Sequence, residues 1–284
     1  ETLRFMEENR NRPMFIFFST NLPHGPVDIP PEENTYAGSP AIRQAYGNAS
    51  GTNRECSGAA EEYASMVDKL DRQVGAIVDQ VRKLGLDKRT IIIFSSDNGH
   101  ELYYRTDKGR GRGPDCHGGV LDGTGELLDV FRGSRGRVGP NNAMANLAGL
   151  KWTSHEGGIR VPLIISWPGT LPHGKVCHSL VANYDHMASF ADLAGIRMPE
   201  GKDAVSYMDI LSGNSSRQRD YVVVDHTVIT GDGWKLTQKQ NKPFLFHIGR
   251  DPEERNNLAG TRKDQLEKLR AIYRKEVGSP RKDR

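Results

Sequence analysis

The sequence predicts an α/β protein with a largely parallel central sheet flanked by helices, followed by a small antiparallel sheet and a terminal helix. Short apolar runs of β-type residues, such as Met14–Phe18 and Thr90–Ser95, have the length of strands that are buried on both faces. A long helical pattern separates these two runs, and this alternation is typical of a parallel sheet. After Gly213, strand-like runs recur about every ten residues and are joined by polar turns, which is typical of an antiparallel meander.

The elements of the larger part follow in order. The strand at Met14–Phe18 leads into a polar loop that is rich in proline, glycine and asparagine. A helix of about six turns is predicted next, and it ends at Gly85, a residue type favoured just after helix ends. A third strand is predicted at Arg160–Trp167, and a helix at Asp185–Ala194 is closed by Gly195. The apolar positions that predict the long helix are Tyr63, Met66, Val67, Leu70, Val74, Ile77, Val78, Val81 and Leu84.

The C-terminal part differs in its pattern. Strands are predicted at Tyr221–Val224, Trp234–Thr237 and Pro243–His247. The last segment is predicted to be an amphipathic helix, because charges fill the face opposite its apolar residues Leu266, Leu269, Tyr273 and Val277. We therefore expect two domains, a larger α/β domain over 1–213 and a small sheet-and-helix domain over 214–284.

The composition excludes several classes of protein. A chain of 284 residues with a mean hydropathy of −0.62 can bury a sizeable core, and none of its apolar runs approaches the roughly 18–20 residues that a membrane helix needs. Its net charge is +3, and the basic C-terminal stretch coincides with the solvated face of a helix, so nucleic acid is not an expected partner. Three widely spaced cysteines, Cys56, Cys116 and Cys177, exclude a disulfide scaffold and a zinc finger.

Residues 103–150 form a long segment, rich in glycine and arginine, between the second and third predicted strands. Such a segment within a compact domain is usually functional or disordered. An insertion near a functional site is the preferred interpretation, because acidic residues interrupt the basic ones. Nucleic-acid binding by the Arg/Gly repeats is the alternative.

Polar residues follow two of the predicted strands. His24 comes after the first strand, and Asp97, Asn98 and His100 come after the second. Because ligands of open α/β sheets bind at the carboxyl ends of the strands, we expect these side chains on one rim. Carboxylate and amide oxygens suit a hard cation such as Ca²⁺ or Mg²⁺. A simple Asn-Gly turn at Asn98 is the structural alternative.

The densest group of polar residues is Lys151-Trp-Thr-Ser-His-Glu-Gly-Gly-Ile-Arg-Val-Pro162. Its two glycines let the backbone approach another group closely, and Lys151 and Arg160 can both bind an oxyanion. A structural pair between Glu156 and Arg160 is the alternative interpretation.

The two loop histidines, His24 and His100, can donate to an anionic leaving group or act as acid and base, although a lone loop histidine is more often a surface or packing residue. Together, an oxygen-ligand pair, a lysine and a histidine on one rim describe a site for an anionic sulfuryl or phosphoryl ester.

Four motifs, in this order along the chain, resemble the type I sulfatases, a formylglycine-dependent family of the alkaline phosphatase superfamily. They are Leu22-Pro-His-Gly-Pro, Ser96-Asp-Asn-Gly-His, the segment from Lys151 to Pro162, and Asp251-Pro-Glu-Glu-Arg-Asn-Asn-Leu. The resemblance extends from about Phe5 to Ala259. It implies an alkaline phosphatase-like fold and the hydrolysis of sulfuric esters.

The resemblance also implies roles for individual residues. Asp97 and Asn98 match the pair that ligates the active-site cation, usually Ca²⁺, with Mg²⁺ possible. Lys151 matches the lysine that holds the sulfate ester, and His24 matches a histidine that contacts the sulfate or the leaving oxygen, so both are expected catalytic residues. With His100 they form the expected substrate-binding set. The implied substrate is a sulfated small molecule or glycan, and the family favours export to the periplasm, the lysosome or the outside.

Two departures from the family pattern change these expectations. The family nucleophile is a formylglycine made from a C/S-x-P-x-R motif, and no such motif occurs in this sequence. The aspartates that complete the metal site from the first strand are also absent. We therefore expect that the chain is the C-terminal part of a longer protein, and that alone it has no turnover and binds a cation weakly. A third departure is His155, which stands where an aromatic residue is more usual.

Two alternatives to a sulfatase stay open at this point. One is a phosphodiesterase or phosphonate monoester hydrolase of the same superfamily, which the nucleophile motif and an ester assay would separate. The other is a non-catalytic remnant that binds anionic glycans. The sequence does not predict the oligomeric state.

Overall fold

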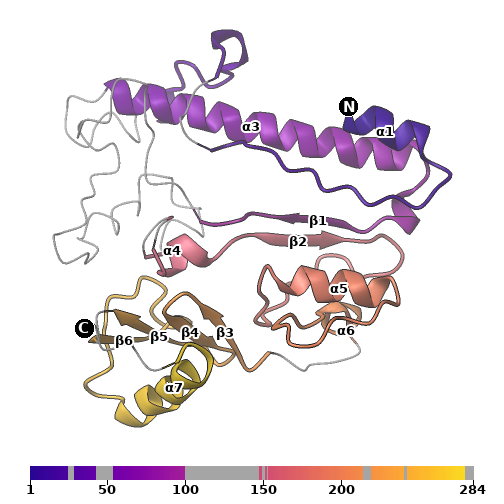
Figure 1. The fold of residues 1–284 in the computed structure, drawn as a ribbon. Coiled ribbons are helices and arrows are strands. Elements are labelled where there is room, and N and C mark those ends of the chain that lie inside the picture. Colours follow the sequence, from indigo (N-terminus) through magenta and orange to yellow (C-terminus); the bar gives the residue numbers. More distant parts are fainter. Residues whose placement is uncertain are drawn as a thin grey trace. The chain divides into compact units, whose positions relative to one another are not determined.

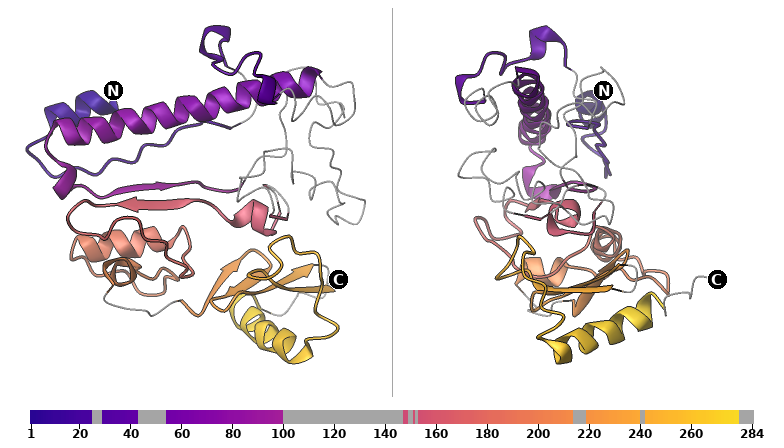
Figure 2. Two further views of the ribbon diagram at one scale, coloured as in Figure 1. Left: turned by 180° about the vertical axis from the view of Figure 1, so that it is seen from behind. Right: turned by 90° about the vertical axis from the view of Figure 1, so that its left-hand side faces the viewer.

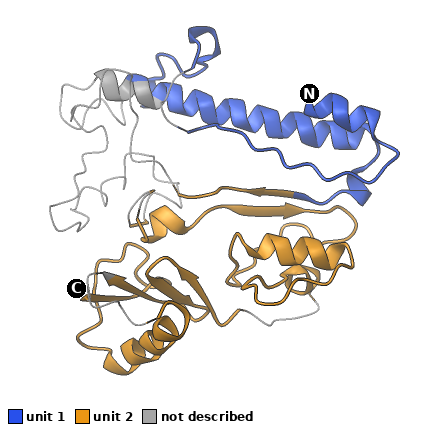
Figure 3. Cartoon of the chain, viewed as in Figure 1, with its two compact units in different colours: residues 1–92, 100–146 blue, residues 93–99, 147–284 orange. Residues whose placement is uncertain are grey.

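The structure of the chain is a computed structural model, and contacts divide it into two compact units (Figure 3). The described part of the first unit lies within 1–92, and the second unit combines 93–99 with 147–284. This division differs from the domain boundary predicted after residue 213, which stays a prediction. None of the described helices is long and apolar enough to cross a membrane. The described residues are 1–24, 29–42, 54–99, 147–148, 151, 153–213, 219–239 and 242–278.

The first unit is built on the long helix α3 (Arg54–Lys83), with the short helix α1 (Thr2–Glu8) beside it in every view (Figures 1 and 2). Met6 of α1, Val81 of α3 and Leu86 are buried together. The helix ends where the sequence predicts, because Gly85 adopts φ +64° and its N–H donates to the Arg82 carbonyl at 2.9 Å. Two 3-10 helices, η1 (Pro31–Glu33) and η2 (Asp87–Arg89), complete the unit.

Buried polar groups of α3 hold the loop that follows η1. Ser65 is fully buried and donates to Asn34 Oδ1 at 2.8 Å, while the Tyr36 N–H donates to Ser65 Oγ at 3.1 Å. The Gly38 N–H donates to the buried carboxylate of Glu61 at 2.9 Å. These bonds satisfy backbone groups that would otherwise lie unpaired against the helix. The sequence did not predict them, since their partners lie 31, 29 and 23 residues apart in the chain.

The run Met14–Phe18 is not a strand in the structure. Among the described residues it belongs to neither sheet. Phe15 and Phe17 are 72% and 83% exposed, so the predicted burial on both faces is not observed. An apolar run forms a strand only where a neighbouring strand supplies its hydrogen-bond partners. The sequence of the run alone does not show whether such a neighbour is present.

The second unit contains a two-stranded sheet of β1 (Ile92–Ser95), from its second residue on, and β2 (Leu163–Ser166) (Figure 1). Both strands were predicted, and β2 runs back along β1 in the opposite direction. β2 is more exposed than a strand buried on both faces, with Ile164 at 62%. Among the described residues this pair is therefore the part of the central sheet that forms.

Three helices follow or flank this pair in the same unit: α4 (Glu156–Ile159), α5 (Asp185–Leu193) and α6 (Met208–Ser212). The bounds of α5 agree with the prediction to within one residue. The carboxylate of Asp185 is buried at the start of α5, where it accepts the Ala182 N–H and the Val205 N–H, each at 2.9 Å. These bonds fix the connections on either side of α5.

The C-terminal part of the second unit is a four-stranded antiparallel sheet in the order β3-β4-β5-β6. The predicted strands correspond to β3 (Tyr221–Val224), β5 (Trp234–Lys239) and β6 (Lys242–His247). β4 (Thr227–Thr230) was not predicted. The meander is thus confirmed with one additional strand.

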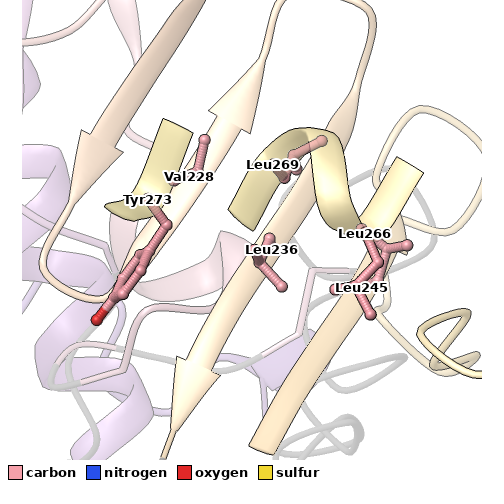
Figure 4. Close-up of a cluster of buried hydrophobic side chains, with 6 residues drawn as sticks. All are labelled: Val228, Leu236, Leu245, Leu266, Leu269 and Tyr273. Atoms are coloured by element: carbon pink, nitrogen blue, oxygen red, sulfur yellow. The ribbon is translucent and has the colours of Figure 1, made fainter. Parts of the chain in front are cut away.

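Helix α7 (Lys263–Glu276) covers one face of this sheet. Figure 4 shows the buried cluster between them, which consists of Val228, Leu236, Leu245, Leu266, Leu269 and Tyr273. The three helix residues of this cluster lie on the apolar face that the sequence predicts. Val277 follows the end of the helix and is 40% exposed, so it does not extend that face.

Candidate active site

The loop that follows β1 carries the predicted cation ligands. Asp97 is exposed, and its Oδ1 accepts the Asn98 N–H at 2.9 Å. The side-chain nitrogen of Asn98 donates to the Gly99 carbonyl at 2.9 Å. This bond leaves Oδ1 as the Asn98 atom that can face a cation. The loop is tied to the segment before α5 by a bond of 3.0 Å from Asn183 Nδ2 to the Ser96 carbonyl.

Gly99 packs directly against the backbone of α4. Its N–H donates to the Gly158 carbonyl at 2.8 Å. A Cβ added at Gly99 would lie 1.9 Å from the Gly157 carbonyl oxygen, so no larger residue fits without a backbone shift. The close approach that the sequence analysis expected of the two glycines of α4 is therefore an approach to the Asp97–Asn98 loop.

Lys151 lies in the segment that leads into α4. The Gly157 N–H donates to the Ala148 carbonyl at 2.6 Å, and the Ala148 N–H donates to the Pro252 carbonyl at 3.4 Å. Lys151 itself is half-buried. The second unit thus contains Asp97, Asn98 and Lys151, and hydrogen bonds to α4 hold both segments that carry them.

A buried cluster of charges fixes the start of α4. Lys235 Nζ lies 3.0 Å from Glu156 Oε1 and 3.0 Å from Glu254 Oε1. The side chains of Lys235 and Glu254 are 0% exposed, and that of Glu156 is 4% exposed. Glu254 also accepts the Glu156 N–H at 2.7 Å, and His155 Nδ1 lies 2.9 Å from its second oxygen.

The ionisation of Glu254 follows from this surrounding. Burial raises its pKa, while the Lys235 charge and the His155 hydrogen bond lower it, and the net pKa is below the ordinary value of 4.5. The predicted pair between Glu156 and Arg160 is present at 3.8 Å. Lys235 lies closer to Glu156 than Arg160 does. The sequence did not predict this contact, because no local motif surrounds Lys235.

Two further site residues were predicted, His24 and His100. His24 belongs to the first unit, is exposed and follows a cis Leu22–Pro23 peptide, and its N–H donates to the Asn21 carbonyl at 2.7 Å. Its role stays a prediction. His100 lies outside the described residues, as does most of the predicted insertion at 103–150.

The residues present fit part of a cation site. A carboxylate and an amide oxygen at one strand end are donors that Ca²⁺ and Mg²⁺ prefer. Within the described ranges, no three His, Cys, Asp or Glu side chains gather into a metal-binding group. Asp97 and Asn98 therefore offer at most two of the ligands that a hard cation needs, and their role stays a prediction.

Comparison with solved structures shows that this chain has the alkaline phosphatase-like α/β fold. One of them, solved in a study of glycosaminoglycan metabolism by Bacteroides thetaiotaomicron, superposes with a TM-score of 0.69 at 21% identity over 98% of this chain and 53% of the other. Another, in complex with its substrate D-glucosamine-2-N,6-O-disulfate, has a TM-score of 0.54 at 20% identity and covers 77% of this chain and 40% of the other.

The chain belongs to the sulfatase family, because residues 1–196 match that family. Residues 151–282 also match the C-terminal region of N-sulphoglucosamine sulphohydrolase. The N-acetylgalactosamine-6-sulfatase of Canis lupus familiaris is 24% identical over 96% of this chain and 49% of its own length. The N-acetylgalactosamine-6-O-sulfatase of Bacteroides thetaiotaomicron is 26% identical over 67% of this chain and 37% of its own. The chain thus spans about half the length of the mammalian relative.

Proposed function

We propose that this chain is part of a sulfuric ester hydrolase that acts on a sulfated carbohydrate. Membership of the sulfatase family supports the reaction class. The observation that carries the proposal is the backbone contact of Gly99 with Gly157 and Gly158. This contact joins the strand end that bears Asp97 and Asn98 to the segment that bears Lys151, so the donors for a cation and for an anionic ester belong to one packed unit.

In this proposal the Asp97 carboxylate and Asn98 Oδ1 ligate a divalent cation, Ca²⁺ or alternatively Mg²⁺. When bound, the cation would supply positive charge beside the sulfate oxygens. Lys151 binds a sulfate oxygen through its ammonium group. His24 and His100 hold the leaving oxygen, and one of them donates the proton that it needs to depart.

Sulfatases are in general formylglycine- and metal-dependent. The present sequence has no C/S-x-P-x-R motif, and the roles assigned above are confined to residues of this chain. The nucleophilic step is therefore not assigned to any of its side chains.

A 6-sulfated amino sugar is the proposed substrate class. Two relatives named above are N-acetylgalactosamine-6-sulfatases, and one similar structure holds a sulfated glucosamine. On the family resemblance we also propose that the protein acts outside the cytoplasm.

The proposal is tested by sulfate release from N-acetylgalactosamine-6-sulfate. The enzyme is a polypeptide that joins this chain to a segment with the C/S-x-P-x-R motif, produced together with a formylglycine-generating enzyme. We expect release that depends on Ca²⁺ and falls by about 100-fold or more in Lys151→Ala, as for the loss of one transition-state donor. Lys175→Ala, which changes an exposed lysine, is the matched control and keeps full activity.

Other outcomes would point to the alternatives. Hydrolysis of a phosphate diester or phosphonate ester in preference to the sulfate ester would replace the sulfatase by a phosphodiesterase or phosphonate monoester hydrolase. Retention on heparin without turnover of any ester would indicate a glycan-binding protein.

A further inference from the structure

The buried charges around Lys235 have no part in the proposed reaction. Lys235 comes from the middle of the C-terminal sheet, Glu254 from the turn after β6, and Glu156 is the first residue of α4. Lysine and glutamate are rarely buried completely unless they are paired. Here each carboxylate has Lys235 Nζ at 3.0 Å, and these three side chains are named the Lys235 triad.

The Lys235 triad specifies a position more than it adds stability. The desolvation of buried ions offsets most of their mutual attraction, and apolar side chains of similar volume are often as stable. A buried ion pair nevertheless tolerates little displacement, because moving one charge leaves the other unpaired in a medium of low polarity. The residue that it fixes here is Glu156, whose N–H also donates to Glu254 at 2.7 Å.

The position of Glu156 affects the loop that carries Asp97 and Asn98, which is named the cation loop. The two residues that follow Glu156 are the glycines that contact Gly99 of this loop. Glu156 begins a single turn of helix that places the Gly157 and Gly158 carbonyls against Gly99. The Gly158 oxygen accepts the Gly99 N–H at 2.8 Å, and the Gly157 oxygen occupies the space beside Gly99 where a Cβ would stand. A shift of α4 would therefore shift the Gly99 end of the loop.

Glu254 is itself held in place by its turn. It adopts φ +47°, a conformation uncommon for a residue with a side chain, and its N–H donates to the Asp251 carbonyl at 3.0 Å. The Asp251 carboxylate in turn accepts the N–H groups of Arg255 and Asn256 at 3.1 and 2.9 Å. This local network presents the Glu254 carboxylate toward α4 at a defined place.

We propose that Lys235 and Glu254 are positioning residues for the cation loop. Through the buried ion pairs, the C-terminal sheet and its following turn fix α4, and α4 fixes the loop of Asp97 and Asn98. The inference rests on the proposed function, in which Asp97 and Asn98 ligate the cation. Neither Lys235 nor Glu254 contacts the cation or the substrate.

The first test is hydrogen exchange in the 284-residue chain without added cation. We expect Lys235→Met to raise the exchange rate of the Gly99 amide by about tenfold or more, since that amide opens with α4. Leu269→Ala is the matched control, because it opens a cavity in the same C-terminal core without touching the triad. It is expected to speed exchange in the C-terminal sheet and to leave the Gly99 amide as in the wild type.

A second variant covers a failure of the first to fold. Lys235→Met alone removes the shared partner of two buried carboxylates and leaves them only His155 and Arg160 as basic contacts. Lys235→Met combined with Glu156→Gln and Glu254→Gln instead removes all three charges at nearly constant shape. We expect this neutral variant to fold, as judged by circular dichroism, and still to exchange faster at Gly99. Protection of Gly99 equal to the wild type in the neutral variant would overturn the inference, as would equal Gly99 exchange in Lys235→Met and Leu269→Ala.

The second readout is cation affinity, measured by calorimetry with Ca²⁺ alone. Residues that orient metal ligands typically change affinity by about 10- to 100-fold, and we expect a loss of that size in the neutral variant. Ca²⁺ binding that is unchanged in the neutral variant would overturn the inference and leave the proposed function intact. Absence of Ca²⁺ binding by the wild type, with Gly99 exchange still dependent on the triad, would instead remove the cation role assigned to Asp97 and Asn98.

Discussion

Glu254 is a carboxylate kept ionised inside the protein. Burial raises its pKa, but the Lys235 charge and the His155 hydrogen bond outweigh burial, and the net pKa lies below 4.5. A carboxylate with a depressed folded-state pKa contributes stability above its unfolded-state pKa, and the contribution is lost as pH falls through the folded-state value. The chain is therefore expected to lose this contribution under acid conditions and to keep it at neutral pH.

The prediction is checked by urea unfolding of the wild type and Glu254→Gln at pH 7 and at pH 3. At pH 7 the variant should be less stable by about 2 kcal/mol, because Lys235 and His155 lose a charged partner while Glu156 still pairs with Lys235. The difference should shrink at pH 3, since glutamine does not titrate. Glu200→Gln serves as the control, as its side chain is 89% exposed. A difference of the same size at both pH values would contradict the ionised state of Glu254.

The same residues show what sequence reasoning can reach at this scale. Asp97, Asn98 and Lys151 were predicted because each stands in a local motif. Lys235 was not, because it occupies a strand position where alternation allows either face. Its burial depends on Glu156, 79 positions earlier, and on Glu254, 19 positions later. A partner at that distance leaves no local signal.

At the scale of elements, the candidate site depends on the contact between α4 and the cation loop that follows β1. Gly99→Ala is expected to displace the loop, because the new Cβ would lie 1.9 Å from the Gly157 carbonyl oxygen. This clash is with backbone, so no change of side-chain rotamer can remove it. Ca²⁺ affinity measured by calorimetry should fall by about tenfold or more, as for changes to groups that orient metal ligands. Gly260→Ala is the matched control, since a Cβ there meets nothing within 4 Å. Equal affinities of the two variants would show that the loop tolerates the contact.

Helices and strands differ in how far their sequence patterns predicted them. α5 and α7 were predicted because the apolar residues on the buried face of an amphipathic helix recur every 3.6 residues in its own sequence. β4 was missed because the turn before it is Asp225-His226, in which Asp225 adopts φ +51° without the glycine that usually signals a tight hairpin. A turn built from ordinary residues hides the strand that follows it.

At the scale of the whole chain, apolar periodicity predicted strands, but pairing decided which of them formed. The run Met14–Phe18 has the composition of a buried strand but belongs to no sheet of the described residues, whereas β1 and β2 are hydrogen-bonded to each other. The family fold was predicted from motifs that lie at strand ends and turns, and it is confirmed although this run forms no strand.

The exposure of this run leads to a prediction for the intact chain. Phe17 is 83% exposed, so Phe17→Ser removes apolar surface from water without removing a core contact. We expect the free energy of unfolding to change by no more than about 0.5 kcal/mol, as at other surface positions. Binding of the dye ANS, measured by fluorescence, should decrease because an exposed apolar group is lost. Phe246→Ser is the contrasting variant, since that side chain is 3% exposed and its loss should cost several kcal/mol (about 3–5). If Phe17→Ser destabilised the chain as much as Phe246→Ser, Phe17 would have to pack against other residues in solution, and the run would be a covered strand after all.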